Sequence, residues 1–206
     1  MKRKLLSLIV MMLVISIPFT LVASAGSEED PEVVDEEDTD VFNYLDIVSA
    51  WFYEKAEEPD YLYTAIKLKE INPFHPKQHL VVNWEHNGID CASCMVIGYG
   101  DPWFIFNAGY GHGWWFEEHY VETDGEYDLE TGIIIHKIPK EIINNPQKGD
   151  VLTKTRAAAF ERFGFIGRMG FSRSFLRTIL ITFTGKDVVD NAPELVSYGR
   201  DYIIQY

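Results

Sequence analysis

The sequence lacks most of the features that would identify a function directly. Cysteine occurs only at Cys91 and Cys94, so the fold is not a disulfide-built scaffold and depends on an aromatic and β-branched core. A Gly-x-Ser-x-Gly motif, a His-Glu-x-x-His motif and a Walker loop are all absent. None of the six histidines has a nucleophile partner at a diagnostic spacing. We therefore predict that the protein is not an enzyme.

Long apolar runs are also absent, except at the N-terminus. There a basic start at residues 2–4 precedes an apolar stretch at 5–22 and the small residues Ala23-Ser24-Ala25. This order is typical of a secretory signal with an Ala-x-Ala cleavage site, so residues 1–25 are predicted to be a signal peptide and the protein to be secreted. The alternative is an uncleaved anchor, since the stretch reaches the roughly 17 residues that can span a bilayer. Membrane contact is expected only through this segment, if it stays uncleaved.

Basic residues are scarce relative to acidic ones, with 18 against 32 and a formal net charge of −14. Residues 27–40 carry nine acidic residues and no basic one, and such a segment buries too little apolar surface to order itself. We predict a disordered acidic linker at residues 26–42, with collection of cations as an alternative, and one domain at 43–206. Deleting residues 27–40 should then barely change folding stability.

Basic residues gather instead in residues 154–186, which carry seven of them against one acidic residue. We expect this segment to pair with a partner protein or, loosely, with the acidic linker, and anionic lipid headgroups or an anionic glycan are the alternatives.

Strand and turn patterns predict an all-β fold. Residues 46–54 and 61–69 alternate in polarity and form a first hairpin. Residues 80–86 and 89–99 flank Asn87-Gly88, which is the strongest short hairpin signal in a sequence. These segments predict antiparallel pairing.

An isoleucine-rich segment fixes the fold class further. A strand is predicted at 133–138, one helical turn at 140–143, and a return of the chain at Gly149-Asp150. This corner between two strands is typical of an all-β domain. We predict an antiparallel, jelly-roll-like β-sandwich with one or two short helical turns.

The remaining elements rest on weaker patterns. A helical turn is one interpretation of the three alanines at 157–159. Further strands are predicted at residues 103–107, 114–122, 151–156, 178–184 and 198–206, and turns at the glycines 109, 111 and 113 and at 123–125.

Several stretches carry a family resemblance: DIVSAWFYE, YLYTAIKLKEI, LVVNWEHNG, GIIIHKIPKEIINNPQKGDVL and DNAPELVSYGRDY. With them the chain, over roughly residues 46–206, resembles secreted or surface-attached β-sandwich domains that are frequent in archaea and some bacteria. These are similar in architecture to DOMON-like and family 9 carbohydrate-binding domains. The resemblance implies a noncatalytic accessory or adhesion module.

Aromatic residues are densest between residues 103 and 120. Neighbouring residues of a strand point to opposite faces, so adjacent tryptophans cannot both enter the core without a bulge, and one should lie at the surface. An exposed indole suits stacking on a sugar ring or on a partner protein, although a thick core remains the alternative. The predicted ligand-binding residues are Trp103, Tyr110, His112, Trp114 and Trp115.

A loop at residues 186–194 offers hard oxygen ligands at Asp187, Asp190, Asn191 and Glu194. Calcium is the metal that suits them, but the spacing does not match an EF-hand and a plain turn is favoured. No cofactor is therefore predicted, with calcium as the alternative.

The two cysteines leave three interpretations open. Positions i and i+3 of a strand face opposite sides, so a disulfide between Cys91 and Cys94 needs a bulge. Structural thiols, a local disulfide, and a metal or redox role are all compatible with the spacing.

The function predicted from the sequence is a secreted, noncatalytic binding module at the cell surface, with carbohydrate as the first candidate ligand. The alternative is an interaction subunit of a cell-envelope complex without a small ligand, followed by a metal or redox enzyme. The expected partner is a glycan or an envelope protein, and not a nucleic acid.

Overall fold

The computed structural model describes residues 26–35, 41–74, 78–97, 104–111, 121–161, 189–193 and 197–206. In these ranges the protein is all-β and antiparallel, as predicted, with one 3₁₀ turn and no α-helix. None of the helical structure described has the length and apolar character needed to cross a membrane.

Eleven strands are present in the described ranges. In chain order they are β1 (Val33–Val34), β2 (Ile47–Tyr53), β3 (Tyr61–Leu68), β4 (Gln78–His86), β5 (Ile89–Ile97), β6 (Phe104–Gly111), β7 (Val121–Asp128), β8 (Ile133–Pro139), β9 (Val151–Glu161), β10 (Val189–Ala192) and β11 (Tyr202–Ile203), with the 3₁₀ helix η1 (Lys140–Ile143) after β8. They form one sheet in the order β1-β2-β3-β8-β7-β6-β5-β4-β9-β10, and β11 pairs with β9.

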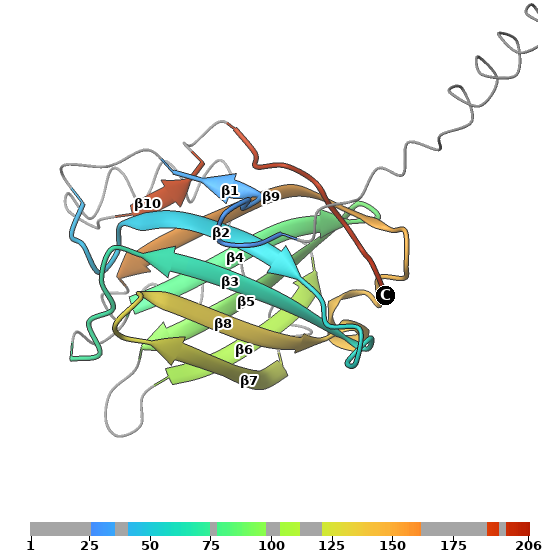
Figure 1. The fold of residues 1–206 in the computed structure, drawn as a ribbon, viewed down its shortest axis with the longest axis horizontal. Coiled ribbons are helices and arrows are strands. Elements are labelled where there is room, and N and C mark those ends of the chain that lie inside the picture. The colour runs from blue at the N-terminus through green and yellow to red at the C-terminus, as the bar shows by residue number, and fades with distance from the viewer. Residues whose placement is uncertain are drawn as a thin grey trace, which may run out of the picture.

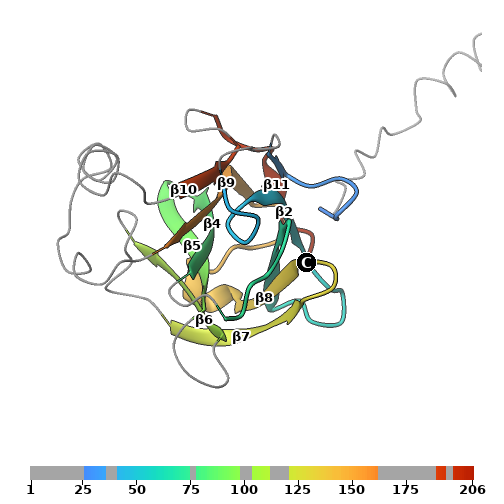
Figure 2. The ribbon, with the colours of Figure 1, turned by 90° about the vertical axis from the view of Figure 1, so that its left-hand side faces the viewer.

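The sheet curls so that its two halves face each other across the core. One wall contains β2, β3 and β8, the other contains β4, β5 and β9, and they join through β6 and β7 (Figures 1 and 2). β7 makes the corner, because residues 121–123 pair with β6 while residues 124–128 pair with β8. The architecture is therefore one continuous curled antiparallel sheet.

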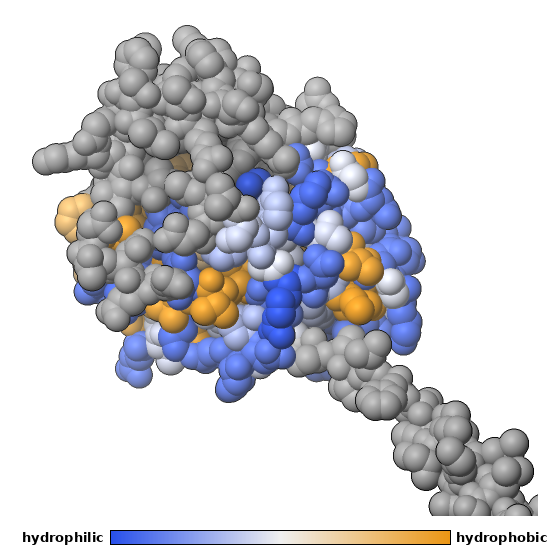
Figure 3. Space-filling model, turned by 90° about the horizontal axis from the view of Figure 1, so that it is seen from above, coloured by the Kyte–Doolittle hydropathy of each residue, from blue (hydrophilic) through white to orange (hydrophobic). Residues whose placement is uncertain are grey.

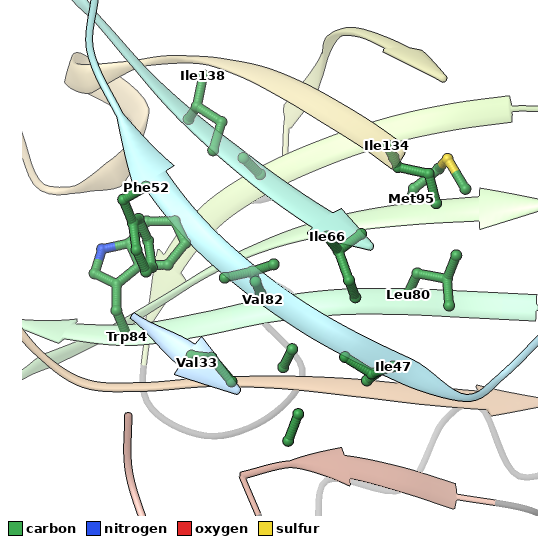
Figure 4. Packing of buried hydrophobic residues seen from close by; sticks show 14 of the residues in the cluster. Val33, Ile47, Phe52, Ile66, Leu80, Val82, Trp84, Met95, Ile134 and Ile138 are labelled. Atoms are coloured by element: carbon green, nitrogen blue, oxygen red, sulfur yellow. The ribbon is translucent and has the colours of Figure 1, made fainter. Parts of the chain in front are cut away.

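Both walls contribute large apolar side chains to the core between them (Figure 4). Phe52 from β2 meets Trp84 from β4 edge to face, with ring centroids 5.4 Å apart and an angle of 85° between the planes. Ile66 and Ile134 lie on the first wall and Met95 on the second, and all three are buried. Each such side chain contributes about 1.5–3 kcal/mol on burial, so these contacts hold the walls together.

The hairpin and the corner predicted from local sequence are confirmed. Asn87 and Gly88 adopt φ angles of 52° and 79°, as a two-residue hairpin turn requires, and β4 pairs with β5 on either side. Asn144 ends η1 in the left-handed conformation with a φ of 66°. Gly149, with a φ of 89°, returns the chain toward β9.

Glycine positions gave two wrong predictions. Gly109 and Gly111, expected in turns, lie inside β6 and pair with β5. Residues 123–125, also expected to turn, lie inside β7. At Gly125 a side chain would collide with the ring of Phe106, so this glycine admits a close contact within a strand and does not mark a turn.

Three further predictions near the C-terminus were also wrong. The alanines at 157–159 continue β9, because β4 pairs with them on one side and β10 on the other. Residues 189–192, expected in a loop, form β10. Of the closing strand predicted at 198–206, only β11 is a strand. The predicted strands at 178–184 and at 114–120 lie outside the described residues.

Residues 26–35 of the acidic segment belong to the fold, which corrects the prediction that they form a disordered, dispensable linker; residues 36–40 lie outside the described residues. Val33 is fully buried and Glu32 is 6% exposed. β1 pairs with β2, so this segment extends the sheet. Its one pair of adjacent valines supplies the strand, and its order depends on contacts with β2 that composition does not reveal. Removing residues 27–40 would remove a buried part of the fold.

Buried carboxylates lie in the region where the edge of β2 meets β10, residues 26–34 and residues 202–206, which we call the seam. The carboxylate of Asp190 accepts a hydrogen bond of 2.6 Å from the backbone N–H of Ile47. Glu32 accepts one of 2.9 Å from the N–H of Phe52. Glu54 follows β2 and accepts one of 2.5 Å from the N–H of Gln205. Side chains therefore satisfy backbone donors that no strand pairs along this edge.

Glu54 also forms a buried ion pair in the seam. Its Oε1 lies 2.6 Å from Nζ of Lys140, and both side chains are almost fully buried. The same ammonium group donates to the backbone oxygen of Tyr206 at 2.6 Å. Two charges thus join β2, η1 and the C-terminus.

Replacing Lys140→Met should lower the free energy of unfolding by about 3–5 kcal/mol, because it leaves the carboxylate of Glu54 buried without its cation. The double variant Lys140→Met/Glu54→Gln should recover much of this loss, since no buried charge remains. Urea denaturation at pH 7 measures both, and the exposed Lys148→Met is the control. Equal losses in the single and double variants would contradict this account of the ion pair.

Candidate functional site

The structure describes only one of the predicted aromatic ligand-binding residues. Tyr110 lies on β6, is partly buried and packs against the main core. Its role is therefore at least partly structural. The other four, Trp103, His112, Trp114 and Trp115, lie outside the described residues, so the site they would form stays a prediction.

The predicted calcium ligands do not converge where they are described. Asp190 is buried and its carboxylate accepts from the N–H of Ile47 in the seam. Asn191 is the next residue of β10 and points to the opposite face. Asp187 and Glu194 lie outside the described residues. In the described ranges there is no group of three or more histidine, cysteine or acidic residues that could hold a metal.

Cys91 and Cys94 are free thiols, so the disulfide alternative is wrong. The pairing of β5 with both neighbours runs without a bulge, which leaves the two side chains on opposite faces. Cys91 belongs to the main core, and Cys94 packs with Val81 and Ala92 on the outer face. Burial raises the pKa of Cys91 to about 12, so a reactive thiolate does not form there at neutral pH.

Both thiols should stay unreactive toward a disulfide reagent such as Ellman's reagent at pH 8 in the native protein, because both are buried. Unfolding in guanidinium should release two thiols per chain without a reductant. Native-state labelling at Cys91, measured by mass spectrometry, would contradict its place in the core.

The structure brings together a group of side chains that the sequence did not single out, on the outer surface of β2, β3 and β8. We call it the tyrosine–lysine face. Because side chains alternate along a strand, residues next to the core positions of these strands point outward. Cross-strand pairing places Tyr53 opposite Tyr63, and Tyr63 opposite Lys137. The face consists of Tyr53, Lys55, Glu58, Tyr61, Tyr63 and Lys137.

Aromatic rings and ammonium groups are in direct contact on this face. The rings of Tyr53 and Tyr63 stack with centroids 4.8 Å apart and planes 18° from parallel. Nζ of Lys55 lies 4.4 Å from the ring centroid of Tyr63, and Nζ of Lys137 lies 4.2 Å from that of Tyr61. Such contacts fix the rings and the amines together.

Glu58 organises the polar ends of the same side chains. Its Oε1 accepts from Nζ of Lys137 at 2.5 Å, and its other oxygen accepts from the hydroxyl of Tyr63. These hydrogen bonds lower the pKa of Glu58, and the bond to Glu58 raises that of Lys137. Burial is the main cause that raises the pKa values of Tyr53 and Tyr63 to about 12. At neutral pH these shifts keep Tyr53 and Tyr63 as phenols, Lys137 as an ammonium group and Glu58 as a carboxylate.

The tyrosine–lysine face continues into an acidic margin on β7. Asp124 lies opposite Lys137, and the outward residues Glu122, Asp124, Glu126 and Asp128 are all exposed. The surface thus passes from aromatic rings to carboxylates across four strands. Another side of the described surface, seen in Figure 3, is mostly hydrophilic with small separate apolar groups.

Part of this face was visible in the sequence. Tyr61 and Tyr63 are two residues apart in a predicted strand, which places them on one side. Lys137 lies far along the chain and arrives only because β8 pairs with β3. The pairing of distant strands was not predictable from local patterns.

Comparison with protein-family models, curated proteins and solved structures finds no match for the chain. The chemistry of the described residues therefore carries the functional argument. Rings with polar groups at their margins can stack on the C–H face of a sugar and hydrogen-bond its hydroxyl groups.

Proposed function

We propose that the protein is a secreted, noncatalytic binding module of the cell surface that binds carbohydrate through the tyrosine–lysine face. The observation that carries the proposal is the cross-strand array of Tyr53, Tyr63 and Lys137, organised by Glu58. Tyr63 is only 3% exposed and supports the stacked ring of Tyr53, so a ligand would contact the partly exposed Tyr53, Tyr61 and Lys137. Ring contacts and ion pairs hold these side chains before a ligand arrives. A ligand therefore meets groups whose conformational entropy is already reduced.

The fold supports a binding role in the same way. The three tyrosines and Lys137 lie on paired strands, so the sheet fixes their positions, while Lys55 and Glu58 come from the connection between β2 and β3. We also propose that the two facing walls are related to the β-sandwich architecture of carbohydrate-binding modules. The pKa of Cys91, raised by burial, supports a noncatalytic role over a redox one.

Glycan-array screening, followed by affinity electrophoresis in gels of the best polysaccharide, tests this proposal. Tyr61→Ala and Tyr53→Ala should each weaken binding by about tenfold or more, corresponding to about 1.4 kcal/mol. Tyr198→Ala is the matched control, because Tyr198 is an exposed tyrosine in contact with Arg156 of β9. Binding that persists in both face variants, or is lost in the control, would contradict this site.

The second candidate is an interaction subunit of a cell-envelope complex, which the exposed acidic margin of β7 favours. A basic protein partner would complement Glu122, Asp124, Glu126 and Asp128 and should bind less tightly as salt increases. Crosslinking in the native envelope distinguishes this function, since it predicts a stable protein complex where the first predicts a glycan.

A further inference from the structure

Gly26 immediately follows the Ala23-Ser24-Ala25 motif and is buried in the seam. A methyl group on its Cα would fall on both carboxylate oxygens of Glu32 and on the carbonyl oxygen of Phe52. Only glycine therefore fits at this position. The residue that would become the N-terminus after cleavage thus lies directly against a buried carboxylate.

The carboxylate of Glu32 occupies an environment that favours a cation. Its side chain accepts from the N–H of Phe52 but is otherwise enclosed, and burial raises its pKa to about 7. The positive charge of Arg200 lowers this pKa, and the negative charge of Asp30 raises it. The guanidinium group of Arg200 is bound to Asp30, at 2.7 Å, and to backbone oxygens of the same segment.

We propose that cleavage of the Ala25–Gly26 bond creates an α-ammonium group at Gly26 that forms an ion pair with Glu32 and locks the N-terminal segment into the seam. Water is the co-reactant: hydrolysis of the amide gives a carboxylate on Ala25 and an amine on Gly26, which is protonated at neutral pH. A membrane peptidase of the secretory pathway makes the cut during translocation, before the seam forms.

The geometry permits this ion pair with little movement. The nitrogen of Gly26 is bonded to the same Cα whose missing methyl would meet the carboxylate, so it lies within about 5 Å of those oxygens. The carbonyl oxygen of Phe52 is a second acceptor for the ammonium group. Cleavage frees the nitrogen from its amide plane, which allows it to turn toward both acceptors.

The ion pair has a defined dependence on pH. An α-amino group has an ordinary pKa of about 7.7–8.0, and pairing raises it while lowering the pKa of Glu32. The gain in stability from the pair is therefore lost as pH rises above the raised pKa of the amine, and as pH falls below the lowered pKa of Glu32. In the uncleaved chain the raised pKa of Glu32 acts against folding: its cost in stability grows as pH rises from about 4.5 to about 7 and is present in full above that range.

The first test is the N-terminal sequence of the secreted protein, which should begin at Gly26. The second compares three purified forms at pH 7: one that begins at Gly26, one with N-acetylated Gly26, and one that retains Ser24-Ala25. The form with the free amine at Gly26 should melt about 3–8 °C higher than the other two. Its α-amine should also react with an acylating reagent at least about tenfold more slowly than that of the extended form.

Glu32→Gln separates the ion pair from general packing, since the amide oxygen can still accept from Phe52 but carries no charge. In this variant the three forms should melt within about 1 °C of one another, and the acylation rates should become equal. Glu29→Gln, an exposed carboxylate in the same segment, is the control and should preserve the difference. A different N-terminus, or an advantage of the free amine that survives in Glu32→Gln, would overturn the proposal.

Discussion

The edge of β2, which the two-residue strand β1 covers only in part, is the constraint on which the rest of this fold depends. A sheet that curls around its own core must bring its two margins together, and backbone N–H groups there become buried without a strand to accept from them. Asp190, Glu32 and Glu54 supply oxygen atoms at these points. Each carboxylate costs desolvation, but an orphaned buried donor would cost about 1–3 kcal/mol as well. The sheet therefore cannot close without burying these acid side chains.

This closure gives part of the acidic composition a structural role. Residues 26–35 carry several carboxylates, and one of them, Glu32, enters the seam while Asp30 binds Arg200 at 2.7 Å. The C-terminus takes part in the same way, because Gln205 donates to Glu54 and Tyr202 pairs with β9. Residues 26–35 and the C-terminal residues 202–206 thus both take part in closing the sheet. The composition of residues 26–35 suggests a solvated linker, but the contacts of Glu32 and Asp30 make this segment part of the fold.

Sequence analysis succeeded where the determining chemistry is local. Asn87-Gly88 specifies its own hairpin, and Pro139 with Asn144 bounds η1, because asparagine and glycine tolerate positive φ angles while proline fixes its own φ. It failed at Gly125 and at the alanines 157–159, where neighbouring strands decide the conformation. The tyrosine–lysine face combines both cases. Its tyrosines could be placed on strands from the sequence, but their meeting with Lys137 depends on long-range pairing of β3 with β8.

Strand β2 connects the core, the seam and the proposed binding face. Phe52 sends its ring into the core and its N–H to Glu32, and the next residue, Tyr53, begins the tyrosine–lysine face. A shift of β2 at the seam would therefore move the stacked ring of Tyr53 relative to Tyr63. Contacts of 4–5 Å between rings and amines tolerate little displacement, because dispersion and cation–π attraction fall steeply with distance. Whatever fixes the N-terminal segment against β2 consequently fixes the geometry of the face as well, although the two sites share no ligand-binding residue.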